Sequence, residues 1–156
     1  LEWNHAESIP WHLLAEQVYH GQLQEYMKDL NHLYRSEPAL YEVDHSWEGF
    51  QWIDFSDTQQ SLISFVRRGK STDEALVFVC NFTPVPRQGY RIGVPMLGFY
   101  QELLNSDSEI YGGSNVGNHG GVHAEEAPHH GQPYSIMIEF PPLATVVFKC
   151  RKKEVA

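Results

Sequence analysis

The chain has 156 residues, of which 42% are hydrophobic and 13% aromatic. A chain of this length buries roughly two-thirds of its unfolded surface, which is enough for one or two compact units. The apolar and aromatic content indicates a globular protein and not a disordered one. The net charge of −9 argues against nucleic acid or an anionic membrane surface as a partner, because these bind to basic surfaces. The longest apolar run, Ala75 to Cys80, is far shorter than the roughly 20 residues that span a membrane.

The first forty residues predict helices. Apolar residues recur at three- and four-residue spacing, which places them on one stripe of a helix over about residues 19 to 36. The stripe consists of Tyr19, Leu23, Tyr26, Met27, Leu30, Leu33 and Tyr34. Pro38 ends this helix, while Ser8 as a cap and Pro10 in a first turn predict a short helix before it. Because an isolated helix of this length is marginal in water, we expect these helices to fold back or to self-associate.

After Trp47 the hydrophobic period changes to two, which is typical of strands. Seven segments rich in β-branched and aromatic residues are separated by turn residues, and together they predict an antiparallel β-sandwich. These segments span 50–55, 61–67, 75–82, 89–94, 99–104, 134–140 and 145–151. In 134–140 the even-numbered residues are predicted to face the core, while Ser135 and Glu139 face solvent.

A long loop over residues 105 to 133 contains glycine at 112, 113, 117, 120, 121 and 131. It is longer than an ordinary hairpin connection, so it is functional, packed on another element, or mobile. Cys80 and Cys150 lie in strand-like runs, where a lone thiol usually behaves as a small buried hydrophobe. We therefore expect free thiols and a cytoplasmic protein.

No pattern in the sequence predicts a catalytic or metal site. Hydrolysis of a glycosidic bond with retention needs two carboxylates about 5 to 5.5 Å apart, whereas acidic residues near turns usually form a solvated face. Three acidic pairs are predicted to lie on a solvated face: Asp54 with Asp57, Asp107 with Glu109, and Glu125 with Glu126. The histidines at 119, 123, 129 and 130 lack the spacing of a recognised zinc site. We expect no catalytic residue, no metal and no cofactor.

The aromatic residues are more informative, because sugar rings stack their C–H faces on flat side chains. Alternation along residues 50–55 places Phe50 and Trp52 on one face of a strand and Ile53 and Phe55 on the other. Trp52 either covers a seam against the N-terminal helices or forms an exposed platform for a glucan, and the two roles are compatible. The weaker candidates of the same kind are Trp11, Tyr19 and Tyr100.

Eight motifs follow one another over nearly the whole chain. They are Glu2–His5, Trp11–Leu14, Asp29–Arg35, Glu37–Leu40, Gly49–Ile53, Asn81–Arg87, Leu104–Asn115 and Pro141–Thr145. In this order they resemble the C-terminal part of bacterial 1,4-α-glucan branching enzymes, which are α-amylase-type glycoside hydrolases of family 13.

The resemblance implies a mainly β chain, in which the terminal helices of a (β/α)8 barrel, residues 1–40, precede a C-terminal β-sandwich, residues 41–156. In that family an Asp nucleophile, a Glu acid/base and a second Asp cleave α-1,4 links and form α-1,6 branches. All three would precede Leu1, so the resemblance implies a non-catalytic chain whose missing barrel is its partner in cis. It also implies that Trp52 and Tyr19 contact an α-glucan such as glycogen or a maltooligosaccharide, and Trp11 is a further candidate contact from its aromatic side chain alone.

Three other hypotheses remain open. The chain could belong to another α-amylase relative, such as a trehalose-releasing hydrolase, although the ordered match from Trp11 to Arg35 argues against this. It could be an independent carbohydrate-binding module, which requires an exposed aromatic platform, or a purely structural sandwich, in which Trp52 is buried. If the barrel is missing, the stripe from Tyr19 to Tyr34 is expected to drive formation of a homodimer.

Overall fold

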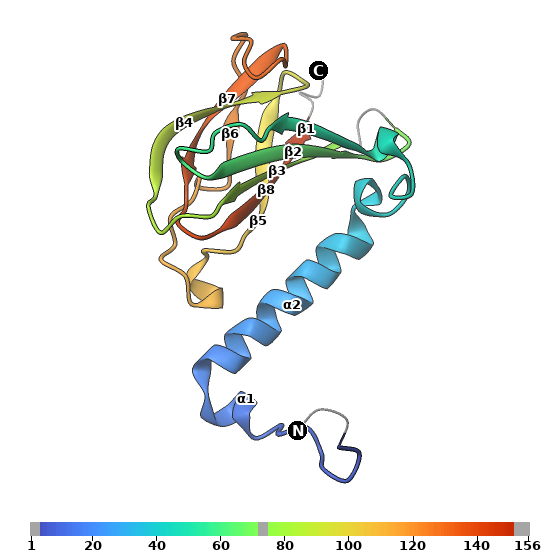
Figure 1. Cartoon of the computed structure of the whole chain (residues 1–156), viewed down its shortest axis with the longest axis vertical. Coiled ribbons are helices and arrows are strands. Elements are labelled where there is room, and N and C mark those ends of the chain that lie inside the picture. The colour runs from blue at the N-terminus through green and yellow to red at the C-terminus, as the bar shows by residue number, and fades with distance from the viewer. Residues whose placement is uncertain (1–3, 72–74, 152–156) are drawn as a thin grey trace.

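In the computed structural model, two antiparallel sheets form a β-sandwich from which a long helix projects (Figure 1). The structure describes residues 4–71 and 75–151. The six-stranded sheet has the order β1-β2-β3-β8-β5-β6. Its strands are β1 Phe50–Asp54, β2 Leu62–Arg68, β3 Ala75–Asn81, β8 Thr145–Arg151, β5 Phe99–Asn105 and β6 Gly121–His123. The second sheet pairs β4 Arg87–Val94 with β7 Tyr134–Phe140. Residues 1–3, which include Glu2 and Trp3 of the first motif, lie outside the described residues.

The sandwich core lies between the two sheets and consists of the β-branched and aromatic residues that alternate along the strands. Val66, Val79 and Phe148 from the large sheet meet Ile136 and Phe140 from the small one, and all five are fully buried. The seven predicted strands are present with ends shifted by at most two residues. Strand β6 has only three residues, which is too short to carry a readable alternation.

The alternation predicted for β7 is confirmed on its core face but is partly wrong on the other. Ile136, Ile138 and Phe140 are buried and Met137 is exposed, whereas Ser135 is fully buried instead of solvated. The reason is that a distant segment covers it. Glu125 forms an isolated bridge with Ser135, and the Arg91 guanidinium donates a 2.6 Å hydrogen bond to the Ser135 hydroxyl.

The N-terminal helices are α1 Leu13–Glu16 and α2 Val18–Ser36. Helix α1 begins at Leu13, so the prediction that Ser8 caps a helix near Pro10 is wrong; the first turn instead forms where Leu13 N–H donates to the Pro10 carbonyl. Helix α2 ends as predicted, because Glu37 is extended, with φ −111°, and leads into the 3-10 turn η1 Pro38–Leu40.

The apolar stripe of α2 divides into two seams. Tyr26, Leu30 and Leu33 pack on the outer face of the large sheet, against a cluster that includes Leu76 and Val147. The second seam is exposed and consists of Tyr19, Leu23, Met27 and Tyr34. The prediction that the helix folds back on the sandwich is therefore confirmed for its C-terminal half, and its N-terminal half extends away from the sheets toward α1 (Figure 1).

Two polar contacts fix α2 and the residue after it to the sandwich. The Tyr111 hydroxyl donates a 2.5 Å hydrogen bond to Asp29, and its ring meets Tyr26 edge-on at 5.1 Å. Lys149 and Glu37 form a largely buried ion pair of 2.6 Å, with side-chain exposures of 16% and 10%. The loop over residues 105–133 is thus packed, since it carries Tyr111 on the 3-10 turn η3 Glu109–Tyr111 and contributes β6 to the sheet.

Cys80 and Cys150 are buried as the sequence predicts, and neither takes part in a disulfide. Burial raises the pKa of the Cys80 thiol, which keeps it in its unreactive protonated form. In the described part of the chain, no helix combines the length and the apolar character required to cross a membrane.

Candidate functional site

An aromatic row crosses the outer face of the large sheet near its β1 edge. We define this row as Phe55, Trp52, Phe50, Phe65 and Phe78. The Trp52 ring centroid lies 5.5 Å from that of Phe55 and 4.9 Å from that of Phe50. Phe65 stacks on Phe50 at 5.2 Å and on Phe78 at 4.9 Å. Phe65 also pairs with Trp52 across strands β1 and β2, so the register of the sheet holds the rings in place.

A β-bulge explains why Phe55 belongs to this row. The pairing of β1 with β2 shifts between Trp52 and Asp54, and Ile53 turns into the core, where only 7% of it is exposed. An extra residue in one strand reverses the alternation beyond it. The prediction that Phe55 faces away from Trp52 together with Ile53 is therefore wrong. Simple alternation applies only as far as the bulge.

The row is open to solvent at one end and covered at the other. Phe55, Trp52 and Phe50 are 64%, 45% and 38% exposed, whereas Phe65 and Phe78 are half-buried. The last two also line an apolar groove of about 370 Å³. Its other lining residues come from α2, η1 and β2 and are Leu30, Asn31, Leu33, Tyr34, Leu40 and Arg67. One continuous apolar surface thus runs from the open edge of the sheet to the helix.

Polar groups gather where β1 ends, on the side of the large sheet that faces β4 and β7. Asp54 accepts hydrogen bonds from the Ser56 backbone N–H and hydroxyl at 3.0 and 2.6 Å, and its Oδ2 lies 3.7 Å from Nε2 of His130. Burial tends to raise the pKa of Asp54, but the Ser56 hydrogen bonds and the nearby His130 outweigh it, so the net pKa is lowered. Asp54 is therefore a fixed carboxylate, and it lies with Tyr90, Ile92 and Phe140 rather than on the face of the aromatic row.

The contact between His130 and Asp54 is not an ion pair at neutral pH. Burial, followed by the neighbouring His129, lowers the pKa of His130 below its usual value, so this imidazole is neutral although it lies close to a carboxylate. The two histidine rings are 4.0 Å apart. Among the described residues, no three His, Cys, Asp or Glu side chains are grouped so that they could hold a metal ion.

The other aromatic candidates lie elsewhere. Tyr19 is 80% exposed near the start of α2, about 26 Å along the helix axis from its C-terminal end, and Trp11 is 62% exposed just before α1. The structure does not bring either together with Trp52, since α1 lies at the far end of the molecule (Figure 1). Tyr100 is 1% exposed, and burial raises the pKa of its hydroxyl, which makes it a core residue.

Asp107 corrects the interpretation of the acidic pairs as solvated. Only 8% of this residue is exposed, because its carboxylate accepts hydrogen bonds from inside the long loop, whereas its partner Glu109 is exposed as predicted. Phe65 and Phe78 were not predicted to belong to the aromatic row. Their alternation along β2 and β3 marks them as facing away from the core, but which elements cover that face cannot be read from a strand pattern.

The comparison with family models decides the classification of the fold. Residues 52–151 match the model described as "Alpha amylase, C-terminal all-beta domain". The chain belongs to this family. The match begins at Trp52, within β1, and covers every strand from β2 to β8, so it includes Trp52 and Phe55 of the aromatic row but not Phe50.

Relatives match almost the whole chain, helices included. The chain is 52% identical to a protein named 1,4-alpha-glucan branching enzyme GlgB from Gloeobacter violaceus. The alignment spans 153 residues, or 98% of this chain and 21% of the relative. A protein of the same name from Aquifex aeolicus is 49% identical over 148 residues, or 95% of this chain and 23% of the relative. The chain thus spans about a fifth of the length of these curated relatives.

Proposed function

We propose that this chain is the non-catalytic C-terminal region of a 1,4-α-glucan branching enzyme, and that it supports the barrel and holds α-glucan on the aromatic row. The proposal is supported by the printed name of relatives that are about half identical along nearly the whole chain. Those relatives favour a branching enzyme over a trehalose-releasing hydrolase. Two buried cysteines outside any disulfide are compatible with the predicted cytoplasmic location.

The observation that carries the glucan-holding role is the open end of the row. Trp52 and Phe55 are 45% and 64% exposed, and their ring centroids are 5.5 Å apart. A sugar ring gains stacking energy on such a surface without reorganising it, because β1 is paired with β2.

The role of supporting the barrel rests on the covered end of the row and on α2. The groove beside Phe65 and Phe78 is apolar, and the exposed seam of α2 offers Leu23 and Met27 to a further partner. We assign residues 1–40 to the barrel and residues 41–156 to the C-terminal domain, because η1 and its Pro38 separate the helix from the first strand. The part of the relatives that this chain lacks would cover both surfaces.

Titration with maltoheptaose, followed by tryptophan fluorescence and calorimetry, tests the glucan-holding role on the whole chain and on Trp52→Ala. We expect saturable binding of maltoheptaose, and we expect Trp52→Ala to weaken it by about tenfold. The reason is that stacking of a sugar ring on an aromatic ring contributes on the order of 1–1.5 kcal/mol. Trp47→Ala is the matched control, since Trp47 is 84% exposed and lies outside the row.

The two outcomes point to different functions. Loss of binding in Trp52→Ala but not in Trp47→Ala supports a glucan platform on this face. If the unaltered chain does not bind at millimolar sugar, or if both variants bind equally, the row is a structural surface, and the purely structural sandwich becomes the better description.

A further inference from the structure

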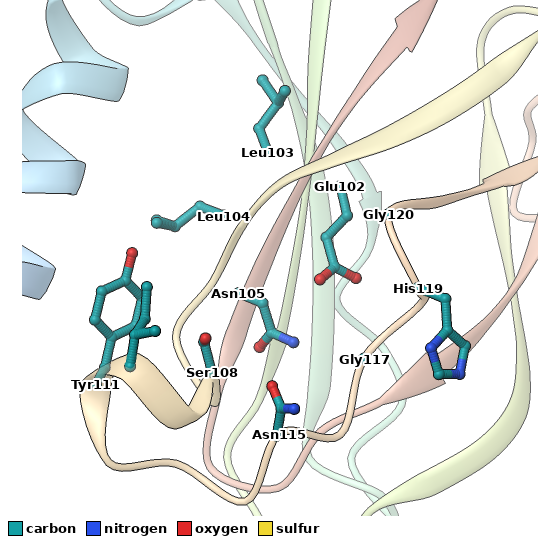
Figure 2. Close-up of a pocket in the computed structure, with 11 residues that line it drawn as sticks. Glu102, Leu103, Leu104, Asn105, Ser108, Tyr111, Asn115, Gly117, His119 and Gly120 are labelled. Carbon is teal, nitrogen blue, oxygen red and sulfur yellow. The ribbon is translucent and has the colours of Figure 1, made fainter.

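A second cavity lies at the opposite edge of the large sheet from Trp52. It has a volume of about 390 Å³ and is enclosed by the end of β5 and the long loop that follows it. Figure 2 shows the carboxylate of Glu102 and the amide of Asn105 directed into this space, with Ser108, Asn115 and His119 around it. Ile110 and Leu103 provide the apolar part of the lining.

The loop around this cavity is held in one conformation by a buried carboxylate. Asp107 accepts hydrogen bonds from Ser114 N–H at 2.9 Å, from the Ser114 hydroxyl at 2.7 Å and from Val116 N–H at 3.0 Å. The amide of Asn105 donates a further bond of 2.8 Å to the Val116 carbonyl. The walls of the cavity are therefore ordered before any ligand arrives, which lowers the entropic cost of binding.

Glu102 is fixed so that only one of its oxygens is available. Its Oε2 accepts hydrogen bonds from the backbone N–H and the side-chain amide of Asn118, at 3.0 and 2.9 Å. Asn118 is itself buried and exchanges hydrogen bonds of 3.2 and 2.8 Å with the backbone of Glu139 on β7. Within the described part of the chain, no group donates to Oε1 of Glu102, which lies on the side of Gly117.

Gly117 keeps the space in front of Glu102 open. A methyl group at this position would lie 2.7 Å from the Asn105 amide nitrogen and 3.3 Å from Oε1 of Glu102. Asn115 and His119, two residues before and two residues after the glycine, have left-handed backbone conformations, with φ of 63° and 50°. These two residues bend the loop around the polar cavity.

The chemistry of the lining selects a neutral ligand rich in hydroxyl groups. Among the described residues lining the cavity, Glu102 alone is acidic, so a metal ion lacks ligands and an anion would be repelled. Ser108, Asn115 and His119 can each donate and accept hydrogen bonds, as a sugar hydroxyl does, and the free oxygen of Glu102 can accept from a diol. The apolar wall suits the C–H face of a sugar ring.

We propose that this cavity, which we call the Glu102 pocket, binds a glucosyl unit and forms a second sugar site independent of the aromatic row. The identity of the sugar rests on the proposed α-glucan function, whereas the preference for a neutral polyol rests on the lining alone. The two sites are separated by four strand spacings, from β1 to β5, or about 19 Å across the sheet. One chain therefore offers two separate contacts to a branched or long glucan, which strengthens binding through multivalency.

The test is an NMR titration of the full 156-residue chain with maltotriose to about 50 mM, with glycerol at the same concentration as a control. We expect the backbone amide signals of Gly117, His119 and Gly120 to move along a saturating curve with maltotriose. The signals should not move with glycerol, because glycerol has no sugar-ring face for the apolar wall to contact. Two variants probe the pocket. Glu102→Gln keeps the shape but removes the charged acceptor, and Gly117→Ala fills the space.

Both variants are expected to weaken maltotriose binding, as measured from these amide signals, by at least about fivefold. Glu102→Gln removes a charged hydrogen-bond acceptor, and Gly117→Ala removes the space for the sugar. Glu126→Gln is the matched control. Glu126 is exposed in the segment that follows the pocket residues, so this substitution removes the same charge without changing the pocket. A chain whose pocket amides do not respond, or a folded Gly117→Ala variant that binds as well as the unaltered chain, overturns the proposal.

The Trp52→Ala variant separates this proposal from the glucan platform. If the pocket amides respond in Trp52→Ala as in the unaltered chain, the Glu102 pocket is an independent site. If only signals near Trp52 respond in the unaltered chain, the pocket proposal is wrong and the platform stands. If only the pocket responds, the platform is wrong, and if neither responds, both are.

Discussion

Asp107 organises the long loop with one buried carboxylate. Its three hydrogen bonds come from Ser114 and Val116, and only 8% of the residue is exposed. Removing such an acceptor leaves buried donors without partners. We predict that Asp107→Ala lowers the free energy of unfolding by roughly 2–4 kcal/mol in urea denaturation. Glu109→Ala, at the exposed neighbouring acid, should change it by less than about 0.5 kcal/mol. Equal effects would mean that the loop does not depend on this carboxylate.

His130 makes stability depend on pH in a defined direction. Its pKa is lowered from 6.5 by burial and by His129, while Asp54 opposes the shift. The unfolded chain therefore binds this proton more readily than the folded one. The contribution of His130 is complete above about pH 6.5 and is lost as the pH falls through the lower, folded-state pKa.

We predict that His130→Asn loses less stability than the unaltered chain when the pH is reduced from about 7.5 to about 5. Asparagine suits this position because the backbone φ is 48°, a conformation that Asn tolerates. Urea denaturation at each pH provides the measurement, with His32→Asn, on an exposed residue of α2, as the control. A variant whose pH dependence matches that of the unaltered chain would exclude His130 as its source.

Helix α2 has a docked half and a free half. Leu33 is 7% exposed and packs on Leu76 and Val147, whereas Leu23 is 59% exposed on the other seam. Substitution of a buried leucine by alanine costs its transfer free energy and leaves a cavity. Leu33→Ala is therefore predicted to destabilise the protein by about 2–4 kcal/mol, and Leu23→Ala by less than about 0.5 kcal/mol.

Thermal or urea unfolding of these two variants measures the difference. The same pair tests whether the helix belongs to the cooperative unit of the sandwich. If Leu33→Ala costs as little as Leu23→Ala, the helix is not docked in solution, and the apolar cluster between α2 and the sheet does not contribute to folding.

The molecule as a whole presents more apolar surface than one sandwich needs. The exposed seam of α2 carries Tyr19, Leu23, Met27 and Tyr34, and the groove beside Phe78 is open as well. Contiguous exposed apolar surface favours association. We predict that this chain by itself forms a homodimer, seen in light scattering as a mass near twice the 17.9 kDa of one chain.

The substitution Leu23→Glu should shift this equilibrium toward the monomer, because it places a charge in the seam. Gln24→Glu adds the same charge one residue away on an exposed position and should leave the mass unchanged. A monomer at high concentration of the unaltered chain would contradict the prediction and would show that the seam is tolerated in water.

Local patterns in the sequence determined most of the elements of this protein. The two-residue period predicts the strands from β1 to β8 except β6, and Pro38 predicts the end of α2, because both depend on residues that are neighbours in the chain. The ordered motifs were also sufficient to indicate the family, and Trp52 was recognisable as an aromatic residue on a strand face that the core did not require.

Only the tertiary structure decided how these elements combine. The bulge at Ile53 moved Phe55 beside Trp52, and the order β1-β2-β3 brought Phe65 and Phe78 into the same row. The loop carboxylate Asp107 and the pocket around Glu102 depend on residues that chain folding brings together, as the hydrogen bonds from Asn118 illustrate. Such contacts cannot be read from periodicity, because periodicity specifies which face a side chain occupies and not what covers that face.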